Sequence, residues 1–232
     1  MRLGDGFRDT PKGLIPFRDT TLIERSLSLI KAAGVNRTVI VTGHCAEMYD
    51  ALAKSSAGFV TTLFNDRYAD RGSLVSLTVA LAAVQGPCLI LDSDIVYEGR
   101  GLAALLDSGL QNAALVSGTT GSGDEYYAWA DDVAGQPFPV LRRLSKRLAD
   151  EPDPPVGEHV GILRVGPDLV RRVAAAAPAK ITAQPLAFYE DCLIEQLPQS
   201  PMGVVKMPDL VWCEIDDPAM LERARREVFP RL

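Results

Sequence analysis

The distribution of apolar and polar positions along the chain predicts strands that alternate with helices. Three apolar, β-branched runs have the length and composition of strands buried on both faces: RTVIVTG, FVTTLFN and PCLILDSD, at residues 37–43, 59–65 and 87–94. Apolar residues at helical spacing predict three helices: one before the first run, at residues 20–34, one between the first two runs, at 46–54, and one after the second run, at 73–84. This alternation predicts an α/β fold with a Rossmann-like, mostly parallel sheet and helices on both faces.

The second half of the chain has a different pattern. Four shorter runs, which alternate partly between apolar and polar residues, predict a small antiparallel extension: residues 113–118, 126–131, 138–145 and 159–166. Helices expected at 167–177 and 186–197 precede a last strand at 210–216, and a helix at 218–229 follows it. We interpret residues 1–232 as a single domain, with a nucleotide-binding core to about 118 and an acceptor-binding part, which includes the last strand, from about 119.

Composition excludes several classes of protein. The net charge of −6 argues against nucleic acid as a partner, because phosphate backbones are held mainly by Lys and Arg. The four cysteines are far apart and form no CxxC pair, so neither a zinc site nor a disulfide framework is expected. No apolar run approaches the roughly 20 residues that span a bilayer, and no signal-peptide pattern opens the chain. We therefore expect a cytoplasmic protein.

Acidic residues follow two of the predicted strands. In LILDSDIVY, Asp92 and Asp94 come at the carboxyl end of a strand, which is the edge where open α/β sheets bind ligands. Asp216 follows the strand LVW in the same way, so Asp94 and Asp216 should converge on one Mg²⁺, which prefers oxygen ligands. Asp92 should support the loop by hydrogen bonds. The alternative is that these carboxylates only cap the next turns, as Asp216 or Asp217 would before Pro218.

Basic residues and glycines are frequent at the start of the chain. Pro11 fixes a loop in which Lys12 presents a point charge suited to phosphate, although most loop lysines are only solvated. In combination, the segments PKGLIPF, TLIERSLSLIKAAGV, VIVTGHCAE, LFNDRYAD and SLVSL, with LILDSD and CEID, resemble nucleotidyltransferases that activate phosphorylated alcohols and sugars. The nearest branches are bacterial choline-phosphate and 2-aminoethylphosphonate cytidylyltransferases, and the resemblance covers nearly the whole chain.

The resemblance also gives a meaning to the opening MRLGDGF. In the family a first strand ends in Leu-Ala-Ala-Gly-x-Gly-x-Arg-Leu. The start of this chain resembles that motif from its Arg-Leu onward, so Arg2 would be the loop arginine. We expect that about ten residues or more, one strand and a tight loop, are missing through a late assigned start or a truncation. The alternative is a lineage that lost this loop.

The resemblance implies roles for further residues. Lys12 and Arg2 would be catalytic, and Asp94 and Asp216 would hold the metal. Nucleotide-binding positions would be Lys12, Gly43, Gly72, Ser73 and Asp92. Choline-type members often carry Asn-Asn where this chain has Gly72 and Ser73, which leaves the exact substrate open.

The acceptor pocket of the choline branch matches GDEYYAWADD and FYEDCLIE. Tyr126 would face an ammonium group, Asp191 would supply a carboxylate, and Tyr189 would be a weaker contributor. Alternatively, Tyr126 and its neighbours are ordinary strand aromatics. His44 and His159 lack a paired nucleophile or metal spacing and are expected to be structural.

Together these observations predict a Mg²⁺-dependent nucleotidyltransferase. It would couple a nucleoside triphosphate to a small phosphorylated alcohol, amino-alcohol or aminophosphonate and release pyrophosphate. CTP is favoured over UTP as the nucleotide. A homodimer is compatible with the sequence. Two other functions stay open: a metal-dependent glycosyltransferase, which also places Asp-x-Asp at a strand end, and a non-catalytic relative.

Overall fold

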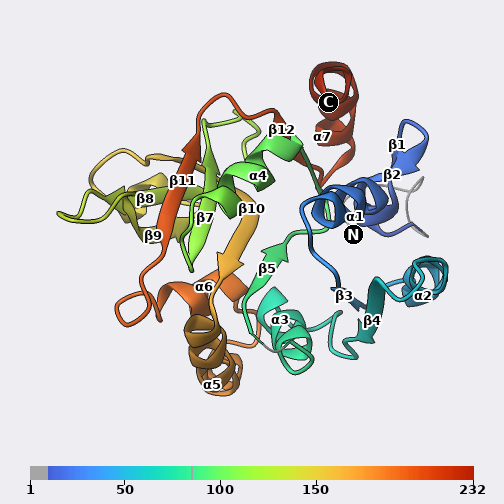
Figure 1. Ribbon diagram of the computed structural model, residues 1–232, viewed down its shortest axis with the longest axis horizontal. Helices are drawn as coiled ribbons and strands as arrows, with labels where there is room; N and C mark the ends of the chain where they lie inside the picture. Colours follow the sequence, from blue (N-terminus) through green and yellow to red (C-terminus); the bar gives the residue numbers. More distant parts are fainter. Residues whose placement is uncertain (1–9, 85) are drawn as a thin grey trace. The chain divides into compact units, whose positions relative to one another are not determined.

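The computed structural model describes residues 10–84 and 86–232, which form two compact units (Figure 1). The first unit contains the chain up to Ala33, Leu89–Arg164 and Met202–Leu232, and the second contains Gly34–Cys88 and Val165–Pro201. The chain therefore leaves the first unit and returns to it twice. Among the described residues, no helix combines the length and the apolar character needed to cross a bilayer.

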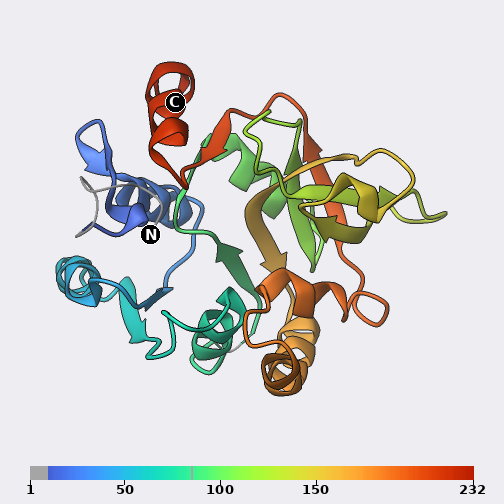
Figure 2. The ribbon, with the colours of Figure 1, turned by 180° about the vertical axis from the view of Figure 1, so that it is seen from behind.

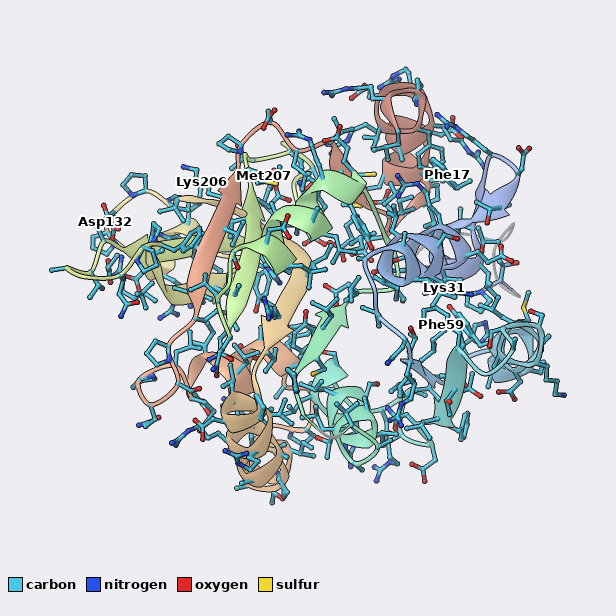
Figure 3. All side chains as sticks on the ribbon, in the orientation of Figure 1. Phe17, Lys31, Phe59, Asp132, Lys206 and Met207 are labelled. Atoms are coloured by element: carbon cyan, nitrogen blue, oxygen red, sulfur yellow. The ribbon has the colours of Figure 1, made fainter. Side chains whose placement is uncertain are left out.

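A six-stranded mixed sheet is the centre of the first unit. Its order is β5-β10-β7-β11-β9-β8, with bounds β5 Cys88–Leu91, β7 Ala113–Ser117, β8 Tyr127–Asp131, β9 Val140–Ser145, β10 Gly157–Val165 and β11 Gly203–Met207. β7 and β11 are parallel, so that Lys206 and Met207 (Figure 3) pair with Val116 and Ser117. β8 pairs with β9, and β10 with β7 and β8, in antiparallel register, which makes this the antiparallel extension that the sequence predicts.

Shorter elements of the first unit surround the acidic strand ends. β6 (Ile95–Tyr97) pairs antiparallel with β12 (Trp212–Glu214), and β1 (Pro16–Phe17) with β2 (Thr20–Thr21). The helices are α1 (Leu22–Ala32), α4 (Gly99–Asp107) and α7 (Pro218–Arg223), which a π-helical turn, η4 (Ala224–Val228), continues. Short 3-10 turns are η2 (Lys12–Leu14), η3 (Leu148–Asp150) and η5 (Phe229–Arg231). α4 packs on β7 and β11, and Figure 2 gives the reverse view.

The second unit is built on one parallel pair of strands. β3 (Thr38–Thr42) and β4 (Val60–Phe64) pair in register from Thr38↔Val60 to Thr42↔Phe64. The helices are α2 (Ala46–Ser55), α3 (Ser73–Leu81), α5 (Pro167–Ala183) and α6 (Tyr189–Ile194), and α3, α5 and α6 pack on one another. The parallel register of β3 and β4 is the pairing that their continuous apolar pattern predicts.

The boundaries of α1 follow from its local sequence. Thr21 is the N-cap, and it forms a capping box with Glu24: Thr21 Oγ1 accepts a hydrogen bond from the Glu24 amide, and the Thr21 amide donates one to Glu24 Oε2 at 3.0 Å. Gly34 follows the helix with a φ of 88°, a conformation that favours glycine. The elements that were not predicted include α4 and β11, besides the short strands β1, β2 and β6. α4 begins with Gly-Arg-Gly, which has low helix propensity, and β11 is only five residues long.

A buried apolar cluster underlies the site described below. It joins residues from both ends of the described chain with the β6/β12 pair: Ile15, Phe17, Leu22, Val96, Val211, Cys213, Ile215, Leu221, Ala224, Val228 and Phe229. Ile15 and Ile215 are fully buried, although Lys12 and Asp216, their near neighbours in sequence, are polar. Burial of these apolar neighbours fixes the backbone from which the polar side chains project.

Candidate functional site

One ammonium group and two carboxylates meet in the first unit. Lys12 Nζ lies 3.0 Å from Asp94 Oδ2 and forms a second ion pair with Asp216. The three residues come from η2, from the turn between β5 and β6, and from the segment that follows β12, and their side chains are only 13–27% exposed. The structure thus brings together three of the residues to which the sequence analysis assigns chemistry, although up to 204 positions separate them.

The backbone explains why Asp94 and Asp216 converge. The β6/β12 register pairs Ile95 with Glu214, and the Ile215 amide donates a hydrogen bond to the Asp94 carbonyl at 2.9 Å. The two acidic residues are therefore held beside each other by main-chain bonds, which do not depend on their charges. Asp217, the next residue, caps α7 by accepting a hydrogen bond from the Met220 amide at 2.8 Å. The capping role belongs to Asp217, and Asp216 is left for the site.

Glu214 adds a third carboxylate to this place. Asp94, Glu214 and Asp216 each offer one oxygen, and these oxygens lie within 4.8 Å of one another. We call these three residues the acidic centre. Oxygen donors at this spacing suit Mg²⁺, which binds a few carboxylates and keeps waters for its other positions. The residues therefore fit the metal that the sequence predicts, while the metal role itself stays a prediction. Glu214 and Asp216 both close this apolar strand in the sequence, but a metal role was predicted for Asp216 alone.

The charges of the acidic centre shift the ionisation of its neighbours. Burial lowers the pKa of Lys12, but the carboxylates of Asp94 and Asp216 more than offset this, and the pKa of Lys12 lies above its ordinary value. Burial, and after it the charges of Asp94 and Asp216, raise the pKa of Glu214 to about 7. Lys146 and Lys12 act in the opposite direction on Glu214. The centre thus holds more negative charge than its one ion-paired lysine balances.

Asp92 lies next to β10. Its amide donates a hydrogen bond to the Gly161 carbonyl at 3.0 Å, and its carboxylate occupies the space that a Cβ on residue 161 would need, with Oδ2 at 2.5 Å from that position. Asp92 does not belong to the group of three carboxylates. Its support of the loop through its side chain and its contact with a nucleotide both stay predictions.

Three predicted nucleotide-binding residues lie in the second unit, around two close contacts. The ring of Tyr68 packs over Gly43, where a Cβ would be 2.4 Å from the ring. At Gly72 a Cβ would be 2.1 Å from the Ala187 carbonyl oxygen. Ser73 begins α3, and its Oγ accepts a hydrogen bond from the Tyr189 amide at 3.0 Å. Glycine is thus required at residues 43 and 72 by packing, whether or not a nucleotide binds there.

The residues predicted to bind the acceptor fall in both units. In the second unit, Tyr189 is buried and Asp191 accepts a hydrogen bond from the Phe188 amide at 3.1 Å at the start of α6. In the first unit, Tyr126 is half-buried, and its ring centroid is 6.4 Å from that of His159. Burial lowers the pKa of His159 to about 4, as suits a structural, neutral imidazole. The amine-binding roles of Tyr126, Tyr189 and Asp191 stay predictions, and Arg2 lies outside the described residues.

Comparison with known proteins decides the family. A model of the MobA-like NTP transferase domain matches residues 1–200. The chain belongs to this family. Two curated relatives of this NTP transferase domain are choline-phosphate cytidylyltransferases. The protein from Haemophilus influenzae is 31% identical over 98 residues, and that from Streptococcus pneumoniae is 37% identical over 76 residues. These segments are 40% and 33% of this chain, and they span only 41% and 32% of the relatives.

Solved structures extend the likeness to the whole chain. The CTP:phosphocholine cytidylyltransferase from Streptococcus pneumoniae superposes with a TM-score of 0.73 at 17% identity, over 96% of this chain and 92% of that one. The inositol-1-phosphate CTP transferase from T. maritima gives 0.79 at 15% identity, over 99% and 90%. At such identities the likeness establishes the fold alone. The NTP transferase domain has the α/β fold that the sequence predicts, and this fold is of the nucleotide-diphospho-sugar transferase type.

Proposed function

We propose that this NTP transferase domain is a Mg²⁺-dependent cytidylyltransferase. It transfers CMP from CTP to the phosphate or phosphonate oxygen of a small acceptor: a phosphorylated alcohol, a phosphorylated amino-alcohol or an aminophosphonate. The observation that carries the proposal is the acidic centre with Lys12 attached to two of its carboxylates. Three carboxylates that lie together carry more negative charge than the single ammonium of Lys12 balances, and this excess charge favours binding of a divalent cation.

Asp94 and Asp216 would hold the metal, with Glu214 as a third oxygen donor. When bound there, Mg²⁺ neutralises charge on the α-phosphate and orients it toward the attacking oxygen. The three oxygens lie within 4.8 Å of one another, and a single coordination shell at metal–oxygen distances of about 2.1 Å spans about 4.2 Å, so binding would draw the carboxylates slightly closer together.

Lys12 would move from the carboxylates to the phosphates of the substrate. Its ammonium is half-buried and remains charged, since its pKa lies above the ordinary value. An oxygen of the acceptor attacks the α-phosphorus, the bond from that phosphorus to its β-bridging oxygen breaks, and pyrophosphate leaves with the electron pair. Negative charge grows on the pyrophosphate and on the five-coordinate phosphorus, and a fixed ammonium stabilises both. The protein contributes positioning and charge and forms no covalent intermediate.

The choice of CTP rests on the relatives. Both curated relatives are named for choline phosphate and cytidylyl transfer, and both superposed structures are named for CTP. A small acceptor with an anionic head group is common to these names. We therefore place CTP before UTP, and choline phosphate and its amine analogues before sugar phosphates.

Product analysis tests this function directly. The purified protein is incubated with MgCl₂, CTP or UTP, and one acceptor at a time: phosphocholine, phosphoethanolamine, 2-aminoethylphosphonate or glycerol phosphate. We expect ³¹P NMR to detect a new phosphoric anhydride and an equal amount of pyrophosphate with CTP, and neither in the presence of EDTA. Turnover of a nucleotide sugar, with no reaction of any triphosphate, would make the protein a glycosyltransferase. Binding of CTP without any product would make it a non-catalytic relative.

A further inference from the structure

A buried carboxylate outside the acidic centre holds a loop of the first unit. Glu158, near the start of β10, is only 3% exposed. Its two oxygens accept hydrogen bonds from Thr120, from the amide at 2.6 Å and from Oγ1 at 3.2 Å. Thr120 belongs to the segment 118–126, which connects β7 to β8 and which we call the connecting loop. Burial of a carboxylate to this extent lowers the free energy of unfolding unless its hydrogen bonds contribute to the fold or the function.

The connecting loop leads from Glu158 toward the acidic centre. The Thr120 carbonyl accepts a hydrogen bond from Arg223 Nη1 at 3.4 Å, at the end of α7. Further along the loop, Asp124 forms an ion pair with Lys146 at 2.9 Å. Lys146 in turn lies close enough to Glu214 for its positive charge to lower the pKa of that residue. Glu158 is thus the buried end of a series of contacts that runs along the connecting loop to Lys146, whose positive charge acts on Glu214 of the acidic centre.

We propose that Glu158 is a positioning residue, which fastens the connecting loop so that Asp124 keeps Lys146 beside the acidic centre. The importance of this position for turnover rests on the proposed function, but the fastening of the loop does not. Glu158 acts through Thr120 and touches no metal ligand among the contacts of the described residues.

The surroundings of Glu158 make this fastening depend on pH. Burial, partly opposed by the two bonds from Thr120, raises the pKa of Glu158 to about 7. The groups that face it are Glu125 of the loop, whose charge raises the pKa further, Arg223 of α7, whose charge lowers it, and Tyr127 of β8. A Glu158 that swings into water would return toward an ordinary pKa. The fastened loop therefore binds the proton more tightly, and it loses stability relative to the released loop as pH rises through 7.

Hydrogen exchange on the substrate-free protein tests the fastening. The probe is the protection factor of the Thr120 amide, corrected for the intrinsic effect of pH. We expect it to fall by about tenfold or more between about pH 5.5 and 8.5 in the wild type. Glu158→Gln should remain protected at both pH values, because a neutral amide still accepts the Thr120 N–H bond and cannot ionise. Glu158→Ala should lose protection at both, and Thr120→Val should lose part of it. Glu222→Gln, an exposed change on α7, is the control.

Two outcomes would overturn the proposal. The first is that the Thr120 amide keeps its wild-type protection factor in Glu158→Ala. The second is that this protection factor still falls with rising pH in Glu158→Gln. If Glu158→Ala does not fold, the wild-type pH series and Glu158→Gln still decide. In the transfer assay, Glu158→Ala should raise the KM of a phosphate-bearing substrate about tenfold with a smaller effect on kcat, and Glu158→Gln should restore it. Absence of any product with the wild type would remove the proposed function and leave the exchange result standing.

Discussion

The acidic centre of the first unit and the start of α3 in the second unit use polar residues in opposite ways. At the acidic centre, the side chains of Lys12, Asp94 and Asp216 bind one another, while the main chain beneath them is paired independently. At the start of α3, the hydroxyl of Ser73 binds a backbone amide, and Gly72 admits a neighbouring carbonyl. The acidic centre keeps a net negative charge that a bound cation can balance. At the start of α3, the polar groups are already engaged in contacts within the fold.

Asp94→Asn should give the largest effect on activity. The substitution keeps the shape of the side chain and the main-chain bond to Ile215, but it removes one of the charges that would hold the proposed metal. We expect kcat to fall by about 10²–10³-fold or more, as for loss of a group that stabilises charge in the transition state. Pyrophosphate release measures this. The melting temperature without metal should change little, and Asp209→Asn, at an exposed ion pair with Arg100, should change neither quantity.

Gly72→Ala should give the largest effect on stability. A methyl group there would lie 2.1 Å from the Ala187 carbonyl oxygen, and backbone on both sides must shift to relieve the overlap. Strain of this kind typically costs about 1–3 kcal/mol. Urea denaturation should therefore show a lower midpoint with an unchanged slope. If the midpoint stayed at the wild-type value, the contact between α3 and the segment before α6 would be looser than described.

Lys12→Met should separate charge balance from packing. The variant retains the apolar stem and removes the cation that pairs with Asp94 and Asp216. Because the pairs are only partly buried, we expect a loss of about 1–2 kcal/mol in metal-free buffer. Added Mg²⁺ should restore more stability to the variant than it adds to the wild type, since it replaces the missing positive charge. Thermal denaturation with and without MgCl₂ measures this, and equal metal effects on both proteins would contradict a shared cation site.

Ser73→Ala should have the smallest effect of the four, and only on stability. It removes one hydrogen-bond acceptor of the Tyr189 amide, a loss of about 1 kcal/mol. We expect kcat/KM to remain within about twofold of the wild type when both proteins are fully folded. A large rise in the KM of CTP would instead support the nucleotide contact that the sequence predicts for Ser73, and would weaken the contrast with the acidic centre.

The convergence of Asp94 and Asp216 was predicted from the apolar run that precedes each residue, whereas the structure brings them together through the antiparallel pairing of β6 with β12. Asp94 and Asp216 each follow a short apolar run, and that pattern is visible in the sequence. Lys12 was predicted from its loop and its resemblance to a family, whereas its ion pairs with both carboxylates required coordinates. The α/β class was predictable because apolar runs of strand length alternate with segments of helical periodicity.

The contacts of other residues of the site cannot be inferred from the local sequence. Glu214 belongs to the acidic centre because the β6/β12 register places it opposite Ile95, and a register between strands so distant in sequence cannot be inferred from either strand alone. Glu158 lies in a strand that appears apolar, and only its bonds to Thr120 distinguish it. The hydrogen bond of Ser73 could not be inferred from the sequence either, since its partner, the Tyr189 amide, is 116 positions away.

The adjacent residues Asp216 and Asp217 have a consequence for how this chain can vary. One carboxylate faces Lys12 and the other closes the first turn of α7, and Pro218 follows immediately. Loss of a single position between Ile215 and Pro218 would force one side chain to serve both purposes, which lie in different directions. Substitutions in this segment can be tolerated one side chain at a time, but its length cannot change. We therefore expect a chain shortened here by one residue to fold with an uncapped α7 or to lose its second strand-end carboxylate.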